Sequence, residues 1–87
     1  MQNYPNPFNP TTQIKYALPA AGPVNLTIYN MLGQEVVRLV DEVKPEGYHV
    51  VEWNGRNHLG TVVGSGMYIF QLRAGEFVQT KKMMLLK

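Results

Sequence analysis

The sequence contains no cysteine and few charged residues, and each scarcity excludes a class of protein. Without cysteine the chain forms no disulfide, although this does not assign a compartment, because many exported domains also lack disulfides. No apolar run approaches the ~20 residues of a membrane-spanning helix, and the first residues do not resemble a signal peptide. The net charge of +2 is too small for a nucleic-acid-binding surface, so we expect no nucleic-acid partner.

Carboxylates are equally scarce, and this argues against catalysis. The chain has only six, and no two fall on adjacent predicted strands with a shared cleft for acid–base chemistry. Ser65 lies between two glycines but lacks the strand-to-helix context of a nucleophile elbow. We interpret His49 as a strand residue with a hydrogen-bonded ring and His58 as an exposed loop residue, because two histidines alone do not form a zinc site. We therefore expect a non-catalytic chain with no cofactor and no metal.

The chain does contain a strong strand pattern at residues 65–72. Tyr68, Phe70 and Leu72 share one parity, so they would face a core between two sheets. Gly66 lets the backbone turn sharply into this strand. Tyr68 could bury its ring and still donate its hydroxyl to a backbone partner, like the tyrosine corner of immunoglobulin-like sandwiches. We interpret this strand as the centre of the fold.

Weaker strand signals flank this segment on both sides. Alternating apolar residues or β-rich composition predict strands at residues 11–18, 24–29, 34–40, 48–53, 61–63 and 76–86. Asn30 and Gly33 predict a short hairpin turn, since glycine tolerates a positive φ there. The apolar residues of 34–40 do not fit one parity, which predicts a bulge or burial on both faces. Residues 41–47 and 54–60 have the composition of exposed loops.

Seven short strands without a long helical period indicate an all-β chain. The predicted fold class is an immunoglobulin-like antiparallel β-sandwich of about seven strands without a disulfide. Trp53 is the only tryptophan and the largest side chain available to fill its core. We expect a Pro/Asn-rich linker at residues 1–10 and an immunoglobulin-like domain at residues 11–87, as part of a longer protein. The predicted core comprises Ile14, Leu26, Ile28, Val51, Trp53, Tyr68, Phe70 and Leu72.

Three surface features suggest contacts with other molecules. The basic and apolar residues 81–87 form either an ordinary final strand or a segment that a receptor recognises. Four aromatic residues could instead form a platform that stacks on sugars: Tyr4, Phe8, Tyr29 and Tyr48. Because a sandwich leaves open strand edges, a weak homodimer is also an expectation. Spacing alone does not decide among these alternatives.

Several short motifs, in their order and spacing, resemble a known family. They comprise residues 3–12 (NYPNPFNPTT), 26–36 (LTIYNMLGQEV), 47–49 (GYH), 53–55 (WNG), 65–68 (SGMY) and 82–87 (KMMLLK). Together they resemble the C-terminal sorting domains of the bacterial type IX (Por) secretion system. This pattern is also similar to the immunoglobulin-like domain of flagellar hook-capping proteins. The sequence departs from the sorting family at Asn54 and Asn57, where that family often carries Asp.

The resemblance implies a C-terminal sorting module that directs an N-terminal cargo domain through the periplasm to the cell surface or medium. Its implied partners are the outer-membrane type IX translocon and a sortase-like surface peptidase. The implied structural motif consists of Gly33, Trp53, Gly66 and Tyr68. An accessory carbohydrate-binding or adhesive module of a secreted enzyme, or a structural immunoglobulin-like spacer, is the alternative. The implied sorting signal, needed for export more than for folding, consists of Lys82, Met83, Met84, Leu85, Leu86 and Lys87.

Overall fold

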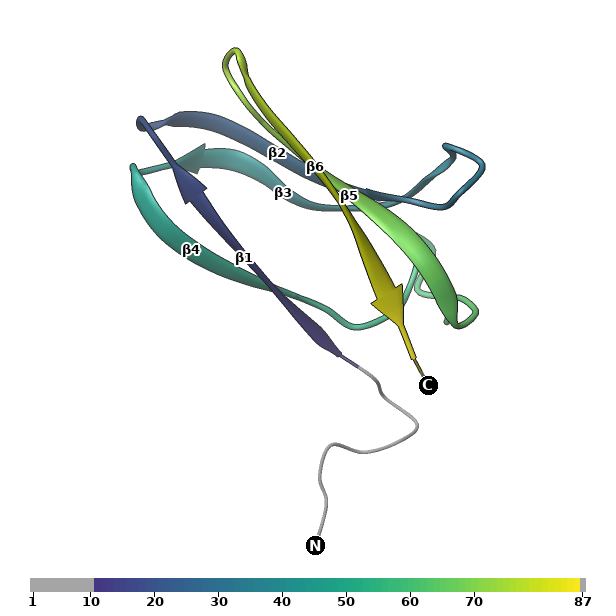
Figure 1. Ribbon diagram of the computed structural model, residues 1–87. Coiled ribbons are helices and arrows are strands. Elements are labelled where there is room, and N and C mark those ends of the chain that lie inside the picture. Colours follow the sequence, from purple (N-terminus) through teal and green to yellow (C-terminus); the bar gives the residue numbers. More distant parts are fainter. Residues whose placement is uncertain (1–10, 87) are drawn as a thin grey trace, which may run out of the picture.

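The computed structural model describes residues 11–86 and contains two antiparallel sheets packed face to face (Figure 1). The smaller sheet pairs β1 with β4, and the larger sheet has the order β3-β2-β5-β6. This confirms the predicted all-β, immunoglobulin-like sandwich. The predicted linker at residues 1–10 lies outside the described residues. The strands are β1 (Thr12–Leu18), β2 (Gly22–Tyr29), β3 (Glu35–Lys44), β4 (Gly47–Trp53), β5 (Gly66–Ala74) and β6 (Phe77–Leu85).

Two of the predicted element assignments are wrong. Residues 61–63 do not form a strand, because their ladder is a single bridge between Arg56 and Val62, so the described residues form six strands rather than seven. The predicted loop at 41–47 is mostly strand, since Asp41 to Lys44 continue β3 opposite residues 22–25 of β2. β3 is an edge strand of the sheet, so its charged side chains can reach solvent without interrupting the ladder.

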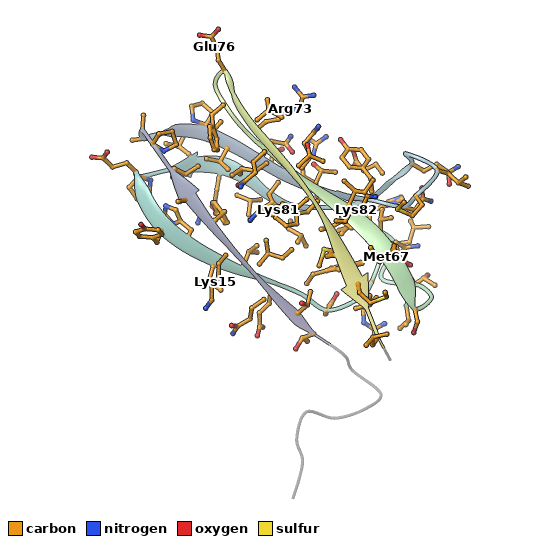
Figure 2. All side chains as sticks on the ribbon, in the orientation of Figure 1. Lys15, Met67, Arg73, Glu76, Lys81 and Lys82 are labelled. Atoms are coloured by element: carbon orange, nitrogen blue, oxygen red, sulfur yellow. The ribbon has the colours of Figure 1, made fainter. Side chains whose placement is uncertain are left out.

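Core-facing and outward-facing residues alternate along the strands, because successive side chains of an extended chain point to opposite faces of the sheet. In β1 the buried residues are Ile14, Tyr16 and Leu18, and in β5 they are Tyr68, Phe70 and Leu72. Figure 2 shows the side chains that fill the space between the sheets. The predicted core is confirmed except at Val51, which is only partly buried. The buried hydrophobic residues are Ile14, Tyr16, Leu18, Val24, Leu26, Ile28, Val36, Val40, Trp53, Tyr68, Phe70, Leu72 and Leu85.

The irregularity predicted for the third strand is confirmed. The register between β2 and β3 shifts after Leu26 and again after Ile28, so β3 carries extra residues at two places. Val36 and Val40 are buried while Val37 and Leu39 are partly buried, so β3 contributes apolar side chains of both parities.

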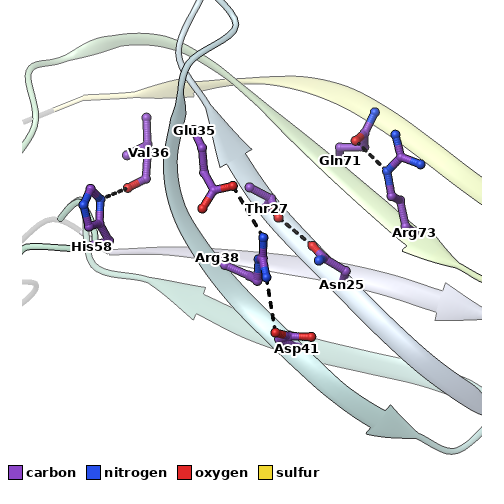
Figure 3. Close-up of polar contacts among 9 residues, drawn as sticks. All are labelled: Asn25, Thr27, Glu35, Val36, Arg38, Asp41, His58, Gln71 and Arg73. Atoms are coloured by element: carbon purple, nitrogen blue, oxygen red, sulfur yellow. Dashed lines mark hydrogen bonds and ion pairs between the residues drawn. The ribbon is translucent and has the colours of Figure 1, made fainter.

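A row of polar residues crosses the outer face of the larger sheet, where Arg38, Thr27, Gln71 and Thr80 pair in register from β3 to β6. Thr27 lies in register between Arg38 and Gln71, and it is buried although it faces away from the core. Its hydroxyl donates a hydrogen bond to Asn25 Oδ1 at 2.6 Å (Figure 3). Arg38 forms ion pairs along the same edge, at 3.6 Å to Glu35 and at 3.3 Å to Asp41. Such exposed pairs contribute little stability, so the fold depends on the apolar side between the sheets.

Candidate functional site

Two turns with the same sequence pattern, Asn-X-Leu-Gly, lie at one end of the sandwich. The first spans Asn30–Gly33 and joins β2 to β3. The Asn30 amide donates to Gln34 O at 3.0 Å, and the Gly33 amide donates to Asn30 O at 3.0 Å. The Asn30 side-chain oxygen accepts the amides of Leu32 and Gln34 at 2.9 and 3.0 Å. An asparagine that accepts its own turn's amides fixes the loop without a partner element.

The second turn spans Asn57–Gly60 and has the same hydrogen bonds. The Asn57 amide donates to Thr61 O and the Gly60 amide donates to Asn57 O, both at 2.9 Å. Asn57 Oδ1 accepts the amides of Leu59 and Thr61, both at 3.0 Å. Gly33 and Gly60 share a φ of +83°, a region that L-residues with a side chain rarely adopt. The two turns are therefore structural copies of each other.

Two core aromatic side chains hold the long loop between β4 and β5. The Trp53 indole N–H donates to Arg56 O at 2.9 Å, where the loop begins. The Tyr68 hydroxyl donates to Gly64 O at 2.6 Å, where the loop ends. The two rings meet edge to face at a centroid distance of 5.1 Å. The predicted backbone bond of Tyr68 is confirmed, and Gly66 begins β5 as expected.

His58 joins the second turn to the beginning of β3, the strand that follows the first turn. Its amide donates to Val36 O at 3.0 Å, and its ring Nδ1 lies 3.4 Å from the same oxygen (Figure 3). His58 is an exposed loop residue, as predicted, and it also bonds to the backbone of β3. A hollow of about 430 Å³ lies between the turns. Its lining residues are Asn30, Gln34, Glu35, Val36, Asn57, His58, Val63 and Tyr68.

The turns also present apolar side chains to solvent. Leu32 is 84% exposed and Leu59 is 76% exposed, and Met31 is exposed beside Leu32. We call Met31, Leu32 and Leu59 the turn face. Exposed leucines on rigid turns beside a polar hollow suit contact with another protein, because apolar groups gain from burial and fixed turns lose little entropy on binding.

The described residues offer little for chemistry. Among residues 11–86 no group of three or more histidine or carboxylate residues could hold a metal ion. Burial raises the pKa of Tyr16 above 10.0, and the nearby Glu42 carboxylate raises it further. Tyr16 stacks on His49 at a centroid distance of 5.3 Å, and His49 Nε2 lies 2.8 Å from Pro45 O. His49 therefore has the structural role that the sequence predicted.

Among residues 11–86 no helix has the length and apolar composition that a membrane span requires.

The segment interpreted as a sorting signal is partly core. Lys82 to Leu85 belong to β6, where Met83 pairs with Tyr68 and Leu85 pairs with Gly66. Leu85 is only 2% exposed, so this segment also contributes a side chain to the core. Leu86 is exposed beyond the strand, and Lys87 lies outside the described residues.

Of the predicted aromatic platform, the two described residues do not lie together. Tyr29 lies on β2 in the larger sheet, whereas Tyr48 lies on β4 in the smaller sheet. Tyr4 and Phe8 lie outside the described residues. Within residues 11–86 these aromatic side chains therefore share no surface on which a sugar could stack.

Comparison with known proteins identifies the family. The family described as FlgD Ig-like domain matches residues 8–81. The chain belongs to this family. No curated protein sequence matches it. The match includes both Asn-X-Leu-Gly turns and ends before Lys82.

Solved structures of FlgD share the fold. FlgD from P. aeruginosa superposes with a TM-score of 0.69 at 21% identity, covering 86% of this chain and 59% of that one. FlgD from Xanthomonas campestris, whose structure is described as giving insights into the hook capping essential for flagellar assembly, superposes with a TM-score of 0.68 at 20% identity. The match covers 88% of this chain and 56% of that one. The chain thus spans under two thirds of either structure.

These findings correct the functional part of the sequence interpretation. The similarity to hook-capping proteins is confirmed, whereas the type IX sorting assignment is wrong, because the family match and both structural relatives are FlgD. The type IX translocon, the sortase-like peptidase and the N-terminal cargo domain are therefore wrong as partners. Localisation as the C-terminal part of cell-surface or secreted cargo is wrong for the same reason, as is the accessory or spacer module of a secreted enzyme.

Sequence reasoning also missed the relation between the two turns. The sequence predicts a hairpin turn at Asn30–Gly33 and a loop at residues 54–60, and the repeat of Asn-X-Leu-Gly that relates them is also visible in it. Asparagine at the first position and glycine at the fourth, followed by a polar residue, would have predicted the same turn twice. The bond from His58 of the second turn to Val36 of β3 has no such signal.

Proposed function

We propose that this chain is the immunoglobulin-like part of a FlgD-type hook-capping protein and serves as a structural, non-enzymatic module in flagellar hook assembly. The observation that carries the proposal is the family match over residues 8–81, which covers most of the sandwich. The FlgD structure from Xanthomonas campestris, described in connection with hook capping, points to the hook, and both relatives extend beyond the part that this chain covers.

The turn face gives the proposal a contact site. Its leucines are exposed on turns fixed by four asparagine hydrogen bonds, so they would reach a neighbouring subunit without ordering a loop.

The experiment is an in-frame removal of residues 11–86 from the encoding gene in its own host, followed by electron microscopy of hooks and a motility assay. We expect hooks to be lost while the remaining protein is still produced, as shown by immunoblotting. Unchanged hooks in cells that contain the shortened protein would contradict the proposal.

A second variant separates the turn face from the fold. Leu32→Gln combined with Leu59→Gln should reduce hook number while leaving the thermal midpoint of the purified chain unchanged, because both side chains are exposed. Met84→Gln, an exposed residue of β6, is the matched control and should leave hooks intact. Equal effects of the two changes would reject the turn face as the contact site.

A further inference from the structure

The two sheets are unequal, and part of β6 has no strand opposite it. Two strands face four, and β6 is an edge of the larger sheet. The core-facing side chains of β6 pair in register with core-facing residues of β5, yet Leu85 at one end is 2% exposed while Phe77 at the other is 37% exposed. Cover by the smaller sheet therefore decreases along β6 toward Phe77.

A groove of about 400 Å³ follows this uncovered stretch, between β1 and β6. Its walls are residues 15–17 of β1, residues Phe77, Gln79 and Lys81 of β6, and Tyr48 of β4. An adjoining hollow of about 500 Å³ shares Tyr48 and Phe77 and adds Glu46. Tyr48, opposite Ala17 in the ladder, is 92% exposed.

The strand that borders this groove has an unpaired edge. In the described part of the chain β1 pairs with β4 alone, so the backbone groups of its other edge face the groove side. An unpaired edge is a template for another extended segment. A strand added there would complete a three-stranded smaller sheet and would lie over the uncovered part of β6.

The charges around the groove favour one kind of occupant. Lys15 and Lys81 line it, and neither forms an ion pair with a described carboxylate, in contrast to Lys44, which pairs with Glu42 at 3.6 Å. Figure 2 labels both lysines on their strands. Glu46 lies in the adjoining hollow, beyond Phe77. An occupant that matches this layout is acidic beside the lysines and apolar beside Phe77.

A second copy of the chain does not match. β1 (TQIKYAL) and β6 (FVQTKKMML) contain lysines and no carboxylate. Pairing these edges between two copies would place like charges on neighbouring strands, which destabilises a ladder. The charges therefore disfavour the homodimer expected from open edges alone.

We propose that the free edge of β1 binds an extended segment of a partner protein by strand addition, with acidic side chains beside Lys15 and Lys81 and an apolar side chain over Phe77. Backbone hydrogen bonds to β1 would supply affinity, and the groove would select the side chains. This goes beyond the proposed function, since the edge lies apart from the turn face and its binding does not require a hook.

The test uses the 87-residue chain and a blocked peptide of seven residues, the length of β1. One half of the peptide is a run of glutamates, and the other half alternates valine and threonine; both sequence directions are used. Amide NMR titration should shift residues of β1 and the Phe77–Lys81 part of β6. A peptide with lysine in place of glutamate should bind about tenfold more weakly. A peptide with a central proline, which cannot complete the ladder, should also bind more weakly.

Neighbouring lysines of β6 give a matched pair of variants. Lys81→Glu should weaken binding of the glutamate peptide about tenfold and improve binding of the lysine peptide. Lys82→Glu changes the next residue of β6, which lies on the outer face of the sheet. It should change the affinity for either peptide by less than Lys81→Glu does. Both positions are exposed, so dispersed amide spectra will show that the variants fold.

Three results of the peptide titrations would overturn the proposal. These are equal effects of the two variants, shifts confined to another edge such as β3, and no binding of any peptide at millimolar concentration. Concentration-dependent shifts of the chain alone, at β1 and without peptide, would show a second copy on this edge and would also reject the partner segment.

Discussion

The covered and uncovered ends of β6 differ in what lies opposite them. At the covered end Leu85 is buried beside Gly66, close in the ladder to Tyr68, whose ring meets Trp53. At the other end Phe77, also apolar and on the same face of the same strand, remains partly exposed. Strand pattern alone therefore does not bury a residue. Burial also requires an opposing layer, and a two-stranded sheet covers only part of a four-stranded one.

The sharpest test of this difference compares two aromatic residues. Trp53→Ala should destabilise the fold by about 3–5 kcal/mol, because it opens a large cavity and removes the hydrogen bond to Arg56 O. Urea unfolding followed by circular dichroism measures this change in the free energy of unfolding.

Phe77→Ala is the matched control at the uncovered end. It should cost about 1 kcal/mol, because much of the ring is already in contact with solvent and no closed cavity forms. Similar losses for the two variants would mean that Phe77 is as much a part of the core as Trp53.

A smaller effect is expected at the turns of the covered end. Gly33→Ala should cost about 1–2 kcal/mol, since nothing crowds the new methyl group but a φ of +83° strains any L-residue. Gly64→Ala has equally open space and no positive φ, so it should lie within about 0.5 kcal/mol of the unsubstituted chain. Thermal unfolding of both variants checks this, and an equal loss at Gly64 would contradict the role of φ.

The smallest effect concerns alkaline pH at the groove. Tyr16 has a pKa raised above its value of 10.0 in an unfolded chain, first by burial and then by Glu42. The unfolded state therefore loses this proton first as pH rises. The contribution of Tyr16 to the free energy of unfolding is thus constant below pH 10 and decreases above it.

Tyr16→Phe should remove this loss of stability at alkaline pH. Urea midpoints at pH 8 and at pH 11 should fall less with pH in the variant than in the unsubstituted chain. Tyr48→Phe, which removes a hydroxyl from an exposed ring, controls for the loss of one tyrosine. A parallel decrease in Tyr16→Phe and the unsubstituted chain would show that Tyr16 does not contribute to alkaline unfolding.

Local patterns in the sequence predicted much of the fold. The alternation in residues 12–18 and 66–74 predicted which residues of β1 and β5 face inward, because side-chain direction in a strand depends only on parity. The hairpin turn at Asn30 and the hydrogen bond of the Tyr68 hydroxyl are predictable in the same way, because each depends on a side chain that bonds to nearby backbone. The charge of residues 41–44 predicts a loop, but these residues continue β3, because an edge strand accepts charged side chains as well as a loop does.

Local interactions thus specify the strand faces, the central aromatic residues and the two Asn-X-Leu-Gly turns, since each depends on residues within a few positions of one another. The bond from His58 to Val36 of β3, and the burial of Leu85 but not of Phe77, arise from the packing of the two sheets. Those outcomes depend on which strands pair and how far one sheet extends over the other, and the joined residues are far apart along the chain.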